Sequence, residues 1–156
     1  MNVMQKYEKL ILCVLVTLSV CFLISLKGWG QSSGGYAGWR ACMACHAAKV
    51  KSWKETPHAK AFESLRKTNQ EKIPGCVSCH VTAFEEPDGF IDVELTPELT
   101  DVQCEECHGP AKKHVGNMMI REGMVAKPDE RKCKKCNTAG QDPRFNYNEK
   151  RKSVHP

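Results

Sequence analysis

Hydrophobic and polar positions are distributed unevenly along this 156-residue chain. Residues 10–26 (LILCVLVTLSVCFLISL) form an uncharged apolar run, with Lys6 and Lys9 before it and Lys27 after it. The stretch 28–30 (GWG) then offers small residues for cleavage. A basic segment, an apolar centre and small residues follow in the order found in secretory signal peptides. The pattern therefore predicts that the rest of the chain is exported.

The length of the apolar run leaves alternatives open for residues 1–30. Its 17 residues exceed a typical signal-peptide centre and fall just short of a comfortable membrane span. We expect a cleaved signal peptide, and the alternative is an N-terminal membrane anchor retained through residues 10–26. Lipidation at Cys21 fits less well, because Val20 is not the small residue expected before a lipidated cysteine. Each alternative places the following chain in the periplasm or on the extracytoplasmic face of the membrane.

The remaining chain is predicted to form a linker and one domain of short helices. Residues 31–40 begin with the flexible sequence QSSGG, and the domain would cover residues 41–156. In a first helix, three positions at helical spacing would share one face: His46, Val50 and Trp53. A second helix would begin at Thr56-Pro57, an N-cap with a first-turn proline, and carry a stripe of three residues: His58, Phe62 and Leu65.

Turn signals and one short strand are expected in the middle of this domain. Residues 87–89 (PDG) predict a turn. Apolar residues alternate with acids across 91–95, which is typical of a short strand. Thr96-Pro97 would open a further helical turn, and the sequence HGP at 108–110 would end the helix that follows it.

Eight of the ten cysteines form four pairs, each with a two-residue gap. The other two, Cys13 and Cys21, lie in the apolar run. The pairs recur at intervals of 28 to 34 residues, which suggests one repeated unit. Histidine follows three of the pairs at once, whereas Asn137 follows the fourth. The motifs are Cys42/Cys45 with His46, Cys76/Cys79 with His80, Cys104/Cys107 with His108, and Cys133/Cys136.

The sequence C-x-x-C-H is the attachment motif of haem c. Two thiols one short turn apart reach the two vinyl groups of one porphyrin, and the adjacent imidazole becomes the proximal ligand of the iron. The alternatives are tetrahedral zinc sites made from two pairs each, or disulfides. Histidine is only 6 of 156 residues, so its repeated position directly after the pairs favours haem. An oxidising compartment also disfavours free zinc-binding thiols.

Three histidines outside the motifs are candidate second axial ligands: His58, His114 and His155. A low-potential haem iron needs a second strong ligand, and imidazole is the common choice. The sulfur alternatives, which more often serve packing, are Met118, Met119 and Met124. Because each repeat is too small to fold alone, we predict a mainly α fold, with short helices and long loops organised around packed haems.

Three segments of the chain resemble the tetrahaem cytochrome c-554 family. They are CMACHAAKVKSWKETPHAKAF, CEECHGPAKKH, and the tail CKKCN…PRFNYNEK…HP. The resemblance covers residues 36–156 and implies that His114 binds the first haem, His58 the third and His155 the fourth. It also implies that the second haem can keep an open axial position opposite His80. Members of this family mostly relay electrons between periplasmic oxidoreductases and other cytochromes.

Asn137 departs from the family pattern, because it stands where the fourth proximal histidine belongs. In one reading, Cys133 and Cys136 still carry a haem whose single strong ligand is His155. In the other, these cysteines form a disulfide and His155 serves the second haem. We expect four haem c groups, of which three are fixed by complete motifs.

Charge is also uneven along the exported part. Residues 85–106 hold nine acids and no Lys or Arg, whereas residues 111–156 hold twelve bases and five acids. Two docking faces of opposite sign would suit brief, salt-sensitive encounters with redox proteins. Ordinary solvated surface is the alternative interpretation. No nucleic-acid partner is expected, because the basic tail accompanies an export signal and no nucleic-acid-binding module.

Three functions are compatible with these features. We expect an electron relay between redox partner proteins rather than an enzyme. The second is a haem enzyme acting on nitric oxide, hydroxylamine or nitrite at an open iron, either beside His80 or at the CKKCN motif. The third is a membrane-anchored cytochrome that oxidises quinol, which requires that residues 10–26 are retained.

Overall fold

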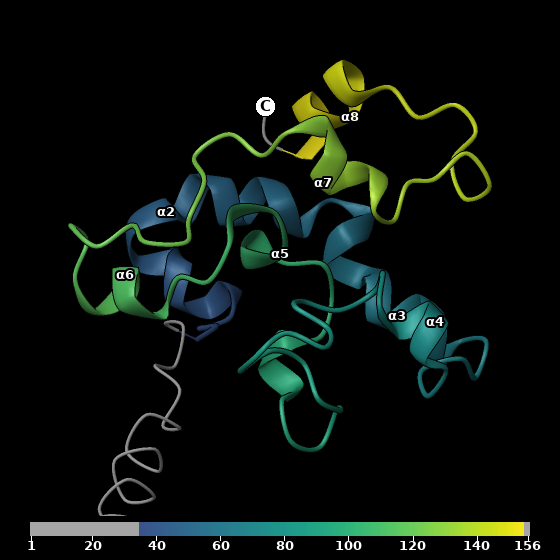
Figure 1. Cartoon of the computed structure of the whole chain (residues 1–156), viewed down its shortest axis with the longest axis horizontal. Coiled ribbons are helices and arrows are strands. Elements are labelled where there is room, and N and C mark those ends of the chain that lie inside the picture. The colour runs from purple at the N-terminus through teal and green to yellow at the C-terminus, as the bar shows by residue number, and fades with distance from the viewer. Residues whose placement is uncertain (1–34, 155–156) are drawn as a thin grey trace, which may run out of the picture. The chain divides into compact units, whose positions relative to one another are not determined.

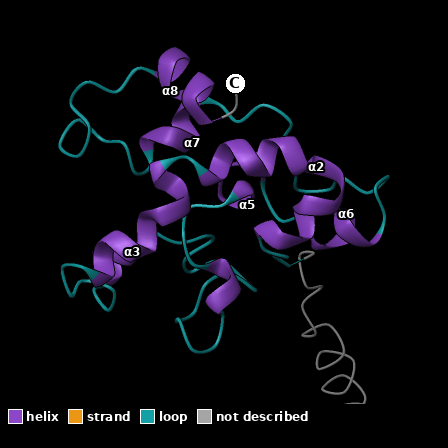
Figure 2. Cartoon of the chain, turned by 180° about the vertical axis from the view of Figure 1, so that it is seen from behind, coloured by secondary structure: helices purple, strands orange, loops and turns teal. Residues whose placement is uncertain are grey.

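The structure is a computed structural model that describes residues 35–154. The predicted signal peptide or anchor at 1–30, the first part of the predicted linker, and His155 lie outside the described residues. Within residues 35–154, short helices are joined by long loops and no strand is formed, as Figures 1 and 2 show. The predicted mainly α class is confirmed.

The helix α2 (Trp39–Lys54) carries the first cysteine pair and is interrupted at His46. His46 has φ −118° and ψ 34°, so the helix kinks directly after the motif. Val50 and Trp53 are buried as predicted, but His46 is exposed and does not share their face. The kink breaks the regular 3.6-residue spacing on which that prediction relied.

Part of the segment expected to be a linker is packed. Gly35 and Gly38 are buried, and α2 begins at Trp39, before the expected domain boundary at residue 41. The indole ring of Trp39 lies 5.7 Å from that of Trp53 and beneath the cations of Arg40 and Lys54. Apolar and cation–π contacts therefore hold the last two residues of the expected linker against the end of α2.

The second predicted helix divides into the 3₁₀ turn η1 (Pro57–Lys60) and the helix α3 (Ala61–Arg66). Thr56 precedes Pro57 as predicted, but its hydroxyl donates to the carbonyl of Trp53 at 2.7 Å instead of capping the turn. Phe62 and Leu65 are buried in the core. The core also includes Val77 from α4 (Pro74–Val77), together with Val81, Phe90 and Leu99 from the chain that follows it.

The segment 91–95 is a loop and not the predicted strand. Ile91 and Leu95 are 64% and 66% exposed, and the carboxylate of Asp92 accepts from the backbone N–H groups of residues 94 and 95. A side-chain turn thus replaces sheet pairing. The expected turn at 87–89 is formed, with the N–H of Gly89 donating to the carbonyl of Glu86, and η2 (Pro97–Leu99) follows.

The last four helices carry the third and fourth cysteine pairs and the candidate ligand His114. Gly109, with φ +87°, ends α5 as the HGP sequence predicted. Asp129 accepts from the N–H of Lys132 and so caps α7. The helices are α5 (Cys104–His108), α6 (Lys112–Gly116), α7 (Glu130–Lys134) and α8 (Tyr147–Val154).

Among residues 35–154, every helix is too short or too polar to cross a lipid bilayer.

Candidate haem-attachment sites

Each cysteine pair is placed on a helical turn. Motif 1 (Cys42, Cys45) lies in α2 and motif 3 (Cys104, Cys107) spans α5. Motif 2 (Cys76, Cys79) begins in α4, and motif 4 (Cys133, Cys136) begins in α7. A helical turn brings residues i and i+3 to the same side, which is the arrangement that two thioether bonds to one porphyrin require. All eight thiols are unbridged in the described structure, so each of them is available for such a bond.

Thiols from different motifs also lie against one another. The thiols of Cys42 and Cys104 are hydrogen-bond partners, which lowers the pKa of Cys42 and raises that of Cys104. Burial, and next a hydrogen bond to Cys79, raise the pKa of Cys136 to about 12. Burial raises the pKa of Cys107 to about 11, and the charge of Cys133 adds to this rise. Motif 1 therefore adjoins motif 3, and motif 4 adjoins motifs 2 and 3.

Three imidazole rings are oriented by backbone carbonyls. Nδ1 of His80 lies 2.7 Å from the carbonyl of Ala61, and Nδ1 of His108 lies 2.8 Å from that of Val125. Nδ1 of His114 lies 3.1 Å from the carbonyl of Ile120. When Nδ1–H donates to a carbonyl, the lone pair is on Nε2, the nitrogen that then faces a metal. In this tautomer, each of the three rings could act as a metal ligand through Nε2.

The two remaining described histidines differ from these three. His46 is exposed at the kink of α2. Burial, and secondarily the charge of Lys150, lower the pKa of His58, which keeps its imidazole in the neutral form that binds a metal. The backbone carbonyl of His58 accepts from the N–H of Val102, so η1 is fixed close to the start of motif 3.

A buried carboxylate inside motif 3 joins three parts of the site. Glu105 is 2% exposed, and its two oxygens accept from the N–H groups of Ala37, Gly38 and Ala111 at 2.8 to 3.1 Å. Ala37 and Gly38 precede α2, and Ala111 precedes α6. Glu105 thus holds the segment before α2, the helix of motif 1, and the start of α6, the helix of His114, against motif 3.

Gln103 extends this network on the other side of motif 3. Its side-chain oxygen accepts from the N–H of Trp39 at 2.6 Å, and its amide donates to the carbonyls of Glu98 and Thr100. Its backbone N–H donates to the hydroxyl of Thr82, which follows motif 2. All of these groups are buried or partly buried, so each bond replaces a lost contact with water.

An ion pair joins motif 3 to motif 4. Nζ of Lys132 lies 3.1 Å from Oε1 of Glu106, and both side chains are partly buried. The other oxygen of Glu106 accepts from the N–H of Ala83 at 2.7 Å, just after motif 2. Burial first, and then the charges of Glu86, Glu106 and Glu105, raise the pKa of nearby Tyr36 to about 12. Acidic side chains therefore gather where three motifs meet.

Asn137 does not offer its side chain as an axial ligand. Its Nδ2 donates to the carbonyl of Cys133 at 3.1 Å, and its backbone N–H donates to the same carbonyl at 3.0 Å. The amide is therefore folded back over the end of its own helix. The thiols of motif 4 fit haem attachment, and Asn137 does not fit the proximal position.

The orienting groups around the motifs are absent from the sequence prediction. The carbonyls of Ala61, Ile120 and Val125 carry no side-chain signature by which they could be found. Glu105 and Gln103 occupy the variable positions in and before a motif, and only their burial in the fold reveals their role.

The zinc alternative requires His, Cys, Asp or Glu side chains to converge in groups of three or more. Within residues 35–154, no such group is arranged to hold a metal ion.

Closely packed thiol pairs on helical turns, together with carbonyl-oriented imidazoles, define a multihaem c-type cytochrome. The family described as "Cytochrome c554 and c-prime" matches residues 41–109, which include the first three motifs but not Asn137. Cytochrome c-554 of Nitrosomonas europaea is 31% identical over 94% of this chain and 68% of its own length. The chain therefore belongs to the cytochrome c554 family, as its motifs indicated, and it is an electron-transfer protein with c-type haems.

The solved structure of reduced cytochrome c554 from Nitrosomonas europaea agrees with this assignment. It superposes with a TM-score of 0.62 at 26% identity, covering 77% of this chain and 83% of that structure. The short helices and long loops thus follow the fold of a known cytochrome c554.

Proposed function

We propose that this chain is an exported relay that passes electrons between redox proteins through four haem c groups. Haem c supplies a one-electron Fe(III)/Fe(II) couple at each attachment site. The attaching cysteines are Cys42, Cys45, Cys76, Cys79, Cys104, Cys107, Cys133 and Cys136. The proximal ligands are His46, His80 and His108, and the distal ligands are His58, His114 and His155.

The observation that carries the proposal is the contact between thiols of different motifs. Cys42 lies against Cys104, Cys79 lies against Cys136, and the charge of Cys133 reaches Cys107. A porphyrin is attached through its edge, so neighbouring thiols bring porphyrin edges together. Electrons can then pass between attachment sites in the order motif 1, motif 3, motif 4 and motif 2, without a diffusing carrier.

Backbone contacts support the assigned distal ligands. Val102 lies two residues before motif 3, and its N–H donates to the carbonyl of His58. This hydrogen bond brings His58 close to the start of motif 3. The N–H of Lys112 donates to the carbonyl of Gly35, which places the helix of His114 beside the start of α2 and motif 1. These positions agree with His58 serving the third haem and His114 the first. For His155, the support is the resemblance of the tail alone.

The expected location and partners follow from the family and the N-terminal sequence. We place the mature chain in the periplasm or on the extracytoplasmic face of a membrane, because haem c is attached outside the cytoplasm and residues 1–30 have signal-peptide features. The partners are other cytochromes or a periplasmic oxidoreductase. Retention of residues 10–26 would add a membrane anchor to the same relay.

Replacing His114 by alanine is expected to leave four haems attached and to convert one of them from low spin to high spin. Loss of an axial imidazole weakens the ligand field, whereas the thioether bonds do not depend on His114. Intact mass of the mature protein counts the haems, and electron paramagnetic resonance of the oxidised protein reports the spin states.

The control for this experiment is Met119→Ala, in the loop that follows α6. Met119 is 88% exposed, so its loss should change neither the mass increment nor the spectrum. Three haem additions in the wild-type mass would overturn the four-haem assignment. An unchanged spectrum in the His114 variant would remove this residue from the ligand set.

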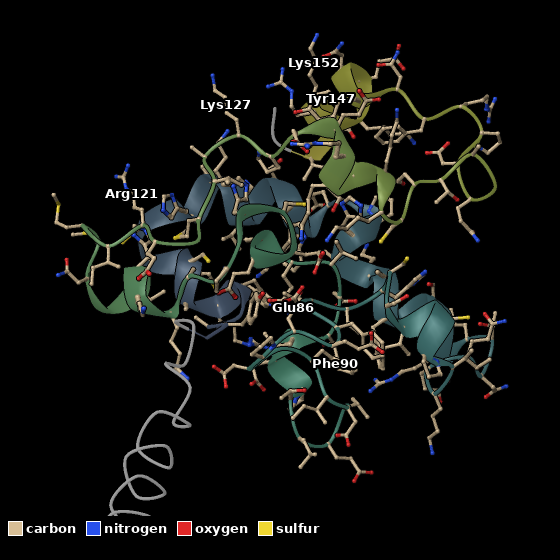
Figure 3. All side chains as sticks on the ribbon, in the orientation of Figure 1. Glu86, Phe90, Arg121, Lys127, Tyr147 and Lys152 are labelled. Carbon is tan, nitrogen blue, oxygen red and sulfur yellow. The ribbon has the colours of Figure 1, made fainter. Side chains whose placement is uncertain are left out.

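Basic side chains project from the loop before α7 and from α8. Figure 3 shows Arg121, Lys127 and Lys152 extending away from the ribbon, and all three are exposed. Glu86 belongs to the acidic stretch elsewhere in the chain, so the two signs of charge are segregated. This segregation supports docking of an acidic partner on the basic side.

The double substitution Lys127→Glu and Lys152→Glu is expected to slow oxidation of the reduced protein by hexacyanoferrate(III) by roughly threefold to tenfold at low salt. A control with Lys51→Glu and Lys72→Glu changes the net charge equally at other exposed positions. Stopped-flow rates should differ between the two variants and converge as salt rises, because screening removes the local field. Equal rates at low salt would assign the effect to net charge rather than to this surface.

A further inference from the structure

We propose that the haem attached at Cys133 and Cys136 has an open axial position on its Asn137 face, where a small uncharged diatomic ligand such as carbon monoxide or nitric oxide binds. The inference rests on the proposed function, because it needs a haem at the fourth motif. It adds a binding site to the relay and assigns that site to one face of one haem.

The first support is the chemistry and position of the side chain. Asparagine offers a neutral amide, which is a weak ligand for haem iron compared with imidazole. Nδ2 of Asn137 is committed to the carbonyl of Cys133 at 3.1 Å, and the backbone N–H bonds the same oxygen. Both bonds hold Asn137 against the end of its own helix. The position normally filled by the proximal histidine therefore receives no strong iron ligand from this motif.

The second support is the chain that follows Asn137. Thr138, Ala139 and Gly140 are small and exposed, and the N–H of Asp142 turns back to the carbonyl of Thr138 at 2.8 Å. At motif 2, in contrast, the two residues after His80 are buried. A small molecule can therefore reach the Asn137 face from solvent without displacing a packed segment.

Charge pairing near the motif favours an uncharged ligand. Lys132 pairs with Glu106 at 3.1 Å, and Lys134 pairs with Glu130 at 2.7 Å. Two of the lysines in and beside the motif are thus balanced by carboxylates, which reduces the attraction for an anion such as nitrite. A neutral diatomic molecule requires only an open position on reduced iron, and its binding does not depend on the local field.

Carbon monoxide titration of the dithionite-reduced holoprotein tests the proposal with two variants. Asn137→His restores the complete motif CKKCH and supplies the missing imidazole. Asn137→Ala removes the amide without supplying a ligand and serves as the matched control. The wild type and Asn137→Ala are expected to bind one more equivalent of carbon monoxide per chain than Asn137→His does, measured in the Soret difference spectrum.

Haem count tests whether the fourth haem is present, and carbon monoxide binding tests whether its Asn137 face is open. Intact mass showing four haems, with equal carbon monoxide equivalents in wild type and Asn137→His, would overturn the open face and leave the relay intact. An intact wild-type mass with only three haems would overturn both the fourth haem and this site. If Asn137→Ala loses the same carbon monoxide equivalent as Asn137→His, the proposal is also overturned, because binding would then depend on the Asn137 amide itself.

Discussion

Replacing Glu105 by alanine is expected to lower the free energy of unfolding by about 3 kcal/mol or more. The substitution removes the acceptors of three backbone N–H groups, those of Ala37, Gly38 and Ala111. The carboxylate is 2% exposed, so water cannot readily replace it. Each buried donor left without a partner costs about 1–3 kcal/mol. Guanidinium unfolding of the holoprotein, followed by circular dichroism, measures the difference.

An exposed acid provides the comparison for Glu105. The side chain of Glu122 is 77% exposed and pairs only with Lys113 in the described structure, so Glu122→Ala should change stability by less than about 1 kcal/mol. Glu105→Gln keeps the volume but turns an amide N–H₂ toward backbone donors, so it should lie between the wild type and the alanine variant. A Glu105→Ala midpoint equal to that of Glu122→Ala would show that the three N–H groups find other partners.

The loss at Glu105 should also alter the haem environment, because this residue joins parts of two motifs. Its partners before α2 position motif 1, and its partner before α6 positions His114. The covalent attachments would survive, since thioether bonds do not depend on these hydrogen bonds.

Features that depend on neighbouring residues were predictable from the sequence. The four cysteine pairs, the turn at 87–89 and the end of α5 at Gly109 all follow from local chemistry, and the structure agrees with the predicted turns. The family resemblance rests on the same local motifs, and the comparisons confirm it. Local rules work here because two thiols and one turn require only a few residues to form.

Features that depend on distant contacts were not predictable. The alternation at 91–95 predicted a strand, but a strand needs a partner, and the described chain supplies only one isolated bridge between Val81 and Thr100. Residues 31–40 were predicted to be a linker, yet the backbone N–H groups of Ala37 and Gly38 in this range donate to Glu105, about 70 residues later. The carbonyls that orient His80, His108 and His114 are likewise invisible in a list of side chains.

Replacing Gly109 by alanine is expected to destabilise the protein by about 2–4 kcal/mol and to disturb the haem of motif 3. Gly109 has φ +87°, and a Cβ atom there would lie 2.2 Å from the carbonyl oxygen of Gly123. The added methyl must push the two segments apart. The same segments are joined by the N–H of Val125 donating to the carbonyl of His108 and by the contact of the His108 ring with the carbonyl of Val125.

Gly116→Ala is the matched control, because it adds the same methyl group at the end of α6, where no atom lies within 4 Å of the new Cβ. This variant should be neutral or more stable by up to about 1 kcal/mol, since alanine favours helix. The two variants should also differ in the low-spin electron paramagnetic resonance signal, because only Gly109→Ala separates the ring of His108 from the carbonyl of Val125. If both variants unfold at the wild-type midpoint with unchanged spectra, the contact between Gly109 and Gly123 does not orient that ligand, and the turn after motif 3 can relax without moving His108.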